Sequence, residues 1–121
     1  MIFGIGTDIV DINRIKKMES LDTFAKKILS EIELLIFNDL KEVKKISYLS
    51  KQFAGKEAIS KAIGTGISGG LTLKEIEIFR DEKGKPYMQP LNRLADLGIN
   101  KTHVSLSDEK DYAIAFVILE K

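Results

Sequence analysis

Residues 52–66, QFAGKEAISKAIGTG, place three charged side chains, Lys56, Glu57 and Lys61, among small and apolar residues. The spacing of the apolar residues is typical of a helix, and a run of glycines ends it. Glu57 and Lys61 stand four residues apart, the spacing of an ordinary ion pair on a helix surface, which contributes only ~0.2–0.5 kcal/mol. The alternative is a phosphate site, in which carboxylates bind a hard cation and lysines neutralise the remaining negative charge. On spacing alone, the ordinary ion pair is favoured.

A further carboxylate, Asp8, lies in an N-terminal run of β-branched residues, on the strand face that also carries Ile2, Val10 and Ile12. Burying a carboxylate there is costly unless a partner compensates it. Hydrogen bonds to nearby backbone would suffice, and spacing alone favours that explanation. The alternative is that Asp8 and Glu57 share a Mg²⁺ with phosphate oxygens.

Other chemistries find little support in the sequence. Gly64, Gly66 and Gly69 satisfy the G-x-G-x-x-G pattern of dinucleotide folds, but they follow a helix and precede a strand, the reverse of that motif's context. The chain has no cysteine and a single histidine, His103, which argues against zinc hydrolases and cysteine nucleophiles. A net charge of +1 with 7% aromatic residues argues against nucleic-acid binding.

The elements that position these residues follow from hydrophobic periodicity and from turn and cap signals. A strand is predicted over residues 1–12, and one long helix over residues 40–63 carries the charged stretch. Ser30 and Glu33 have the spacing of a capping box, which predicts a helix break near Ser30. The remaining predictions are helices at 14–18 and 24–37, a β-hairpin of 71–79 with 84–88, a short helix from Pro90 to Gly98 with Leu91, Leu94 and Leu97 on one face, and strands at 102–108 and 112–120.

This order of elements predicts an α+β fold: a single domain over residues 1–121, with a largely antiparallel sheet packed on one long helix. The sequence has no cysteine for disulfides, no signal peptide and no apolar run of ~20 residues. We therefore expect a cytoplasmic protein with neither a membrane nor a nucleic-acid partner.

Five segments together resemble the holo-acyl-carrier-protein synthases, the small 4′-phosphopantetheinyl transferases. They are GIGTDIVDINRI at 4–15, FAKKILSEIE at 24–33, QFAGKEAISKAIGTGI at 52–67, DEKGKPY at 81–87 and HVSLSDEKDYAIA at 103–115. Each motif is weak alone, but their order and spacing match that family over nearly the full length. The resemblance implies transfer of 4′-phosphopantetheine from coenzyme A to a serine of apo acyl carrier protein in fatty-acid synthesis, with release of adenosine 3′,5′-bisphosphate.

The resemblance also implies roles for the charged residues. Asp8 and Glu57 match the family's strand aspartate and K-E glutamate, and both would bind Mg²⁺. Glu57, directly or through a metal-bound water, would take the serine proton, and Lys61 would stabilise or protonate the departing phosphate. These roles suit phosphoryl transfer, in which positioning and charge neutralisation supply most of the catalysis.

By the same resemblance the protein is a homotrimer with each active site at a subunit boundary. Arg14 and Met18 would dock the acyl carrier protein, assisted by a basic cluster that can steer an acidic partner. Gln52 stands where the family commonly has arginine, which puts one phosphate contact in doubt; Lys44, Lys45 or Lys51 would have to replace it. The residues implied in coenzyme A binding are Lys44, Lys61, Gly64, Thr65, Gly66, His103 and Ser105.

Two alternatives remain beside this interpretation. One is an inactive relative that only binds a phosphate ligand or a carrier protein, but the joint presence of Asp8, Glu57 and Lys61 argues against it, since binding alone would not require all three. The other is a transferase of the same class that serves polyketide or peptide synthases. The larger transferases of that type are built as two fused halves, and this chain has the length of one half.

Overall fold

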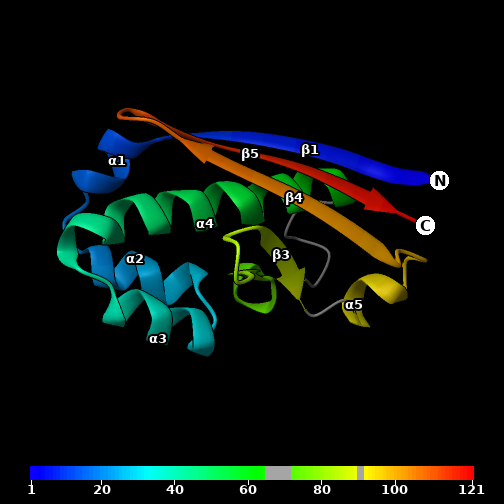
Figure 1. Ribbon diagram of the computed structural model, residues 1–121, viewed down its shortest axis with the longest axis horizontal. Coiled ribbons are helices and arrows are strands. Elements are labelled where there is room, and N and C mark those ends of the chain that lie inside the picture. Colours follow the sequence, from blue (N-terminus) through cyan, green and yellow to red (C-terminus); the bar gives the residue numbers. More distant parts are fainter. Residues whose placement is uncertain (65–71, 90–91) are drawn as a thin grey trace.

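One long helix, α4, Glu42–Ile63, lies against a three-stranded sheet in the computed structural model, which describes residues 1–64, 72–89 and 92–121 (Figure 1). The sheet has the order β1-β5-β4 and is antiparallel throughout. A separate antiparallel hairpin, β2-β3, packs on the other side of α4 from β1. The predicted α+β fold, with an antiparallel sheet on one long helix, is confirmed. The strands are β1 Ile2–Asp11, β2 Glu77–Arg80, β3 Pro86–Gln89, β4 Lys101–Asp108 and β5 Tyr112–Glu120.

The first three shorter helices lie beside the N-terminal half of α4, and the last lies near the opposite end of the molecule (Figure 1). They are α1 Ile12–Lys16, α2 Leu21–Ile28, α3 Glu31–Asp39 and, before β4, α5 Asn92–Ala95. The predicted capping box is confirmed, because the Ser30 side chain accepts from the Glu33 backbone and the Glu33 carboxylate accepts from the Ser30 backbone. Helix α4 ends as predicted at a glycine, Gly64, with a left-handed φ of 93° that favours glycine.

Other elements differ from the prediction in detail. Residues 73–75 form one turn of 3₁₀ helix, so the first hairpin strand begins only at Glu77. Ile2 is exposed, because the β1–β5 register is irregular between Ile2 and Gly4 and breaks the predicted alternation. Leu97 is also exposed, because α5 ends at Ala95, two residues earlier. Pro90 and Leu91 lie outside the described residues.

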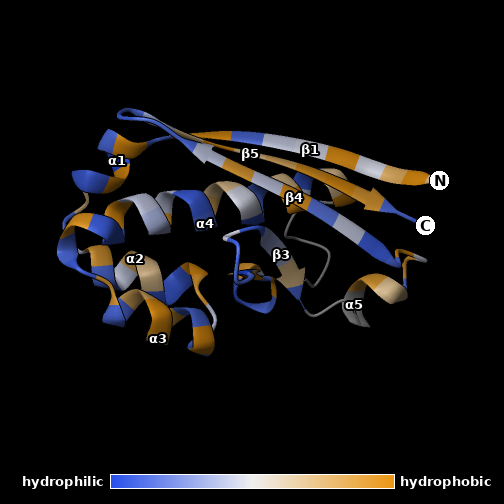
Figure 2. Cartoon of the chain, in the orientation of Figure 1, coloured by the Kyte–Doolittle hydropathy of each residue, from blue (hydrophilic) through white to orange (hydrophobic). Residues whose placement is uncertain are grey.

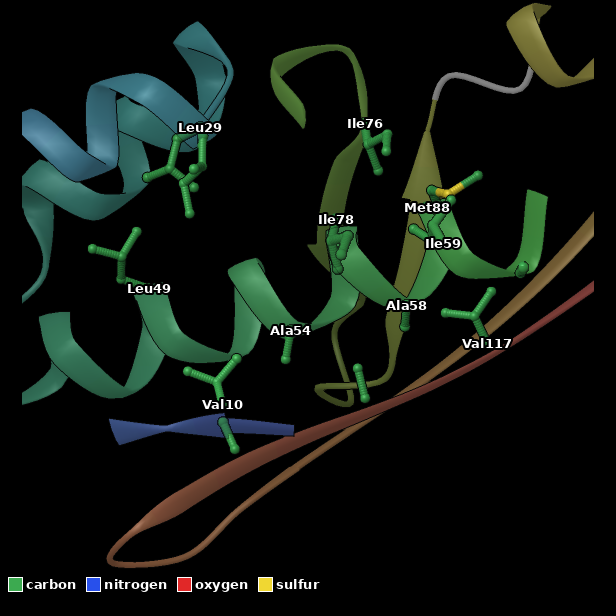
Figure 3. Close-up of a cluster of buried hydrophobic side chains, with 14 of the residues drawn as sticks. Val10, Leu29, Leu49, Ala54, Ala58, Ile59, Ile76, Ile78, Met88 and Val117 are labelled. Carbon is green, nitrogen blue, oxygen red and sulfur yellow. The ribbon is translucent and has the colours of Figure 1, made fainter. Parts of the chain in front are cut away.

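The main core lies between α4, the sheet and the hairpin. In Figure 3, Ala54 and Ala58 point from α4 toward the strands, where Val10 and Val117 lie. The face of the sheet that points away from α4 carries exposed apolar side chains: Ile5 is 60% exposed, Ile9 61% and Phe116 44%. Figure 2 shows apolar colour over most of β5 and, interrupted by pale and hydrophilic segments, along β1. Among the described residues, no helix has the length and apolar character that crossing a bilayer requires.

Two glycines allow β1 to pack directly on the α4 backbone. A Cβ added at Gly4 would overlap the carbonyl oxygen of Ala62, and one added at Gly6 would overlap that of Ala58. Since alternate residues of a strand share a face, Asp8 follows Gly4 and Gly6 on the side that faces α4. The glycines therefore set how closely Asp8 approaches the helix.

A buried polar network joins α3, α4 and β2. Glu33, Gln52 and Lys56 have no exposed surface. The Gln52 amide donates to Glu33 Oε2 at 2.5 Å and to the Ile78 carbonyl at 3.0 Å, and its Oε1 accepts from Arg80 Nη1 at 2.7 Å. This side chain is therefore enclosed in the core, so Gln52 does not offer the phosphate contact that the family's arginine implied. The guanidinium in this region comes instead from Arg80 on β2.

The close approach of β1 to α4 predicts that Gly6→Ala strongly destabilises the fold. The new methyl group meets backbone that cannot move without shifting α4, and overpacking of this kind costs about 3 kcal/mol or more. Gly55→Ala is the matched control, because its Cβ meets the movable end of the Ile78 side chain and alanine favours the helix. Urea denaturation measures both. Equal losses in the two variants would contradict the proposed backbone contact.

The buried network predicts that Gln52→Arg lowers stability, because it places a second guanidinium beside Arg80 without a second acceptor. The exchange Gln52→Arg/Arg80→Gln restores one guanidinium and one amide, so it is expected to be more stable than the sum of its single changes by roughly 0.5–3 kcal/mol. Thermal and urea unfolding of the four proteins give this coupling. Additive losses would show that Gln52 and Arg80 act independently.

Candidate active site

Lys61 links α4 to β1. Its Nζ donates to Asp8 Oδ1 at 3.0 Å and to the Thr7 carbonyl at 3.1 Å. The ion partner of Lys61 is thus an aspartate on a neighbouring strand, and not Glu57 four residues earlier on the same helix. Asp8 has the compensating partner that its partial burial requires, and that partner is the Lys61 side chain on a neighbouring element.

Glu57 lies beside this pair. Burial raises the pKa of the Glu57 carboxyl, the negative charge of Asp8 raises it further, and the positive charge of Lys61 opposes both effects. Two carboxylates that repel each other are a site where a cation is favoured. Among the described residues, no group of three or more Asp, Glu, His or Cys side chains gathers for a metal. Two carboxylates would suit Mg²⁺, a hard cation that is commonly bound by one or two carboxylates together with substrate phosphates.

A cavity of about 310 Å³ opens next to the carboxylates. Asp8 and Glu57 line it together with Arg14 and Met18, so the structure brings the predicted catalytic and carrier-docking residues to one place. Apolar side chains form the rest of the lining, and two of its aromatic residues, Phe24 and Phe53, meet edge to face with ring centroids 5.1 Å apart. The cavity combines an anionic end with an apolar wall.

Three of the other predicted coenzyme A residues, Lys44, His103 and Ser105, are not beside Asp8 and Glu57 in this chain. Lys44 is more than three helical turns before Glu57, about 20 Å along α4, and lines a different cavity. His103 and Ser105 are exposed on the outer face of β4, away from α4, where His103 Nε2 lies 2.6 Å from Glu120 Oε2. Gly64 ends α4, close in sequence to Lys61. Thr65 and Gly66 lie outside the described residues.

Sequence reasoning missed the direction in which Lys56 points. It was grouped with Glu57 and Lys61 as one charged stretch, yet its Nζ is buried and donates to Glu33 Oε1 and to the Leu73 and Ile76 carbonyls. The available signal was the helical step: residues 56 and 57 leave a helix about 100° apart and cannot serve the same face. Glu57 and Lys61, one turn apart, can.

Comparison with known proteins identifies the family of this chain. Residues 4–117 match the model of the 4′-phosphopantetheinyl transferase superfamily. The chain is 48% identical to the holo-[acyl-carrier-protein] synthase of Blochmanniella pennsylvanica, over 100% of both chains. It also resembles the crystal structure of the Neisseria meningitidis holo-[acyl-carrier-protein] synthase, with a TM-score of 0.89 and 42% identity over 100% of both chains.

A third relative was solved with a ligand. The Helicobacter pylori holo-[acyl-carrier-protein] synthase, in complex with coenzyme A, has a TM-score of 0.83 and 32% identity, and the match covers 96% of this chain and 99% of that one. The match is full length in sequence and in fold. This chain belongs to the 4′-phosphopantetheinyl transferase superfamily, and within it to the holo-[acyl-carrier-protein] synthases.

Proposed function

We propose that Asp8, Glu57 and Lys61 form the catalytic centre of this chain. The reaction of a holo-[acyl-carrier-protein] synthase transfers 4′-phosphopantetheine from coenzyme A to a serine hydroxyl of apo acyl carrier protein, and it serves fatty-acid biosynthesis. The observation that carries the assignment is the Lys61–Asp8 contact, together with Asp8 and Glu57 lining one cavity. A surface ion pair of Glu57 with Lys61 would not need an aspartate from β1.

Asp8 and Glu57 are the residues that would hold Mg²⁺. Their mutual repulsion and their exclusively oxygen donors fit a hard cation that also takes phosphate oxygens. When bound, Mg²⁺ supplies charge neutralisation at the pyrophosphate of coenzyme A. Lys61 is a further cation at Asp8, through its contact with Oδ1.

The side chains of this chain account for the proton movements. The serine oxygen forms a bond to the phosphorus that carries pantetheine, and the bond from that phosphorus to the oxygen of adenosine 3′,5′-bisphosphate breaks. The serine proton passes to the Glu57 carboxylate, directly or through a water. Lys61, largely exposed at its tip, donates to the departing phosphate oxygen.

The apolar wall and its basic surroundings are proposed to receive the carrier protein. Arg14 and Met18 line the cavity, and α1 and α2 end in basic residues. An acidic helix of the carrier would find complementary charge there, which raises the association rate. The basic residues are Arg14, Lys16, Lys17, Lys26 and Lys27, all exposed.

The remaining coenzyme A residues are proposed to act across a subunit boundary in a homotrimer. His103 and Ser105 lie on the same outer sheet face as the exposed Ile5, Ile9 and Phe116, so a copy packed on that face would meet them. Contiguous exposed apolar surface of this kind is typical of protein interfaces. Lys44, Gly64, Thr65 and Gly66 are proposed as further nucleotide contacts. A cytoplasmic location, where the carrier protein would be met, stays a prediction.

Intact-mass spectrometry of apo acyl carrier protein, incubated with the purified chain, coenzyme A and Mg²⁺, tests the catalytic assignment. We expect a gain of one phosphopantetheine, lost on chelation and reduced at least about 100-fold in rate by Asp8→Ala or Glu57→Ala, because each removes a metal ligand. Glu82→Ala, which removes an exposed carboxylate in the β2–β3 turn, is the control and should retain full activity. Wild-type rates in Glu57→Ala would remove this residue from the mechanism.

Light scattering tests the proposed trimer. Phe116→Lys places a charge on the outer sheet face and is expected to give monomers with a native circular dichroism spectrum and little transferase activity. Leu35→Lys is the matched control, because Leu35 is 71% exposed on α3 and lies outside the sheet; it should leave the mass and activity unchanged. A wild-type monomer with full activity would rule out the shared site.

A further inference from the structure

Lys56 is a buried lysine for which the proposed mechanism has no use. Its side chain has no exposed surface, and its ammonium donates to three acceptors: Glu33 Oε1, the Leu73 carbonyl and the Ile76 carbonyl. The acceptors come from α3 and from the segment that leads into β2. An ammonium has three donors, so this environment satisfies it completely. Two parts of the chain outside α4 therefore hold the Lys56 ammonium in place: Glu33 on α3, and the carbonyls of Leu73 and Ile76 before β2.

The next residue along the chain is Glu57. Consecutive residues leave a helix about 100° apart, so Lys56 points into the core while Glu57 points toward Asp8 on β1. The contact of Gly6 with the Ala58 backbone fixes the distance between β1 and α4. This contact alone does not fix the rotation of α4 about its own axis. The helix can turn about that axis while one side of its backbone stays in contact with β1.

The required accuracy is high. A carboxylate lies about 5–6 Å from the helix axis, so a rotation of about 20° would move Glu57 by about 2 Å. Functional groups must be held to within about 0.5 Å and 10–20° of their working geometry. Apolar packing opposite Glu57 would fill the space without specifying an angle to that tolerance, whereas three directional hydrogen bonds to one ammonium do specify it.

We propose that Lys56 is a positioning residue of the catalytic centre: its ammonium, held by Glu33, Leu73 and Ile76, sets the rotation of α4 that aims Glu57 at Asp8. Lys56 touches neither the substrate nor the metal and acts through Glu57. The inference rests on the proposed function, since it concerns the accuracy of the Asp8–Glu57 pair. It predicts that loss of Lys56 weakens divalent-cation binding in a protein that is still folded.

The first variant is Lys56→Met with Glu33→Gln, because Lys56→Met alone leaves a buried, unpaired carboxylate and is expected to unfold the protein. Lys56→Gln with Glu33→Gln is the second variant, which keeps an amide donor without leaving a buried carboxylate unpaired, and it serves if the first does not fold. Phe37→Leu is the control: Phe37 is buried in α3, outside the network and the cavity, so it lowers stability without releasing Lys56. Circular dichroism and thermal unfolding establish which proteins are folded.

The primary measurement is Mn²⁺ binding in the presence of coenzyme A, followed by the loss of the free-ion electron paramagnetic resonance signal. We expect the Lys56 variants to bind Mn²⁺ about 10-fold more weakly, the effect of removing an outer support of a metal ligand. The Mg²⁺ concentration for half-maximal activity should rise and kcat should fall, while the KM for coenzyme A changes little. Phe37→Leu should match the wild type in all of these.

The outcomes separate this inference from the function on which it rests. Folded Lys56 variants with wild-type Mn²⁺ affinity and kcat would overturn the positioning role and make the network purely structural. A loss of affinity of the same size in Phe37→Leu would also overturn it, since general destabilisation would then suffice. An inactive wild type that still binds Mn²⁺ would count against the proposed function, and the Lys56 variants would still decide the positioning role through Mn²⁺ affinity.

Discussion

The close packing of β1 on α4 is the constraint on which the rest of the structure depends. Strand and helix approach so closely only because Gly4 and Gly6 present no side chain to the Ala62 and Ala58 carbonyls. This approach lets the Lys61 ammonium on α4 reach Asp8 on β1. The charged centre is therefore a consequence of backbone packing between two elements, each of which alone carries an unremarkable set of charges.

Helix α4 carries charged or polar side chains on two faces, and each face needs partners for them. Toward β1 it presents Glu57, which lines the cavity, and Lys61, whose side chain is 57% exposed, so water and ligands can solvate both. Toward α3 and β2 it presents Gln52 and Lys56 in a fully buried setting. Burial lowers the pKa of Lys56, and the negative charge of Glu33 opposes that shift. Such a pair is tolerated because neighbouring donors and acceptors complete its hydrogen bonds.

Periodicity and local signals predicted the elements well because these depend on nearby residues. The capping box at Ser30, the end of α4 at Gly64 and the final two strands follow directly from residue types and spacing. Asp8 and Glu57 could be selected as a pair because a carboxylate among apolar residues is costly unless a partner or ligand compensates its charge. The resemblance to a family then supplied a role that spacing alone did not favour.

What the sequence could not supply was which residues from distant parts of the chain meet. A helical pattern assigns Gln52 and Lys56 to a face, but it does not reveal that α3 and β2 cover that face with a carboxylate and carbonyl groups. Lys61 was matched with its neighbour in sequence, whereas the cross-element partner Asp8 lies far away along the chain. The sequence also predicted the first hairpin strand to begin before Glu77. It could not reveal that residues 73–75 form a 3₁₀ turn and that the carbonyls of Leu73 and Ile76 accept from the distant Lys56.

The raised pKa of Glu57 means that its ionised carboxylate opposes folding. The folded chain binds the Glu57 proton more tightly than the unfolded chain does, so above both pKa values ionised Glu57 is a penalty on the folded state. Below the ordinary glutamate pKa both states are protonated and the penalty vanishes. A core selected for stability alone would place an uncharged residue here. Retention of two repelling carboxylates at a cavity, with one lysine between α4 and β1, is the pattern expected where charge is kept for a ligand.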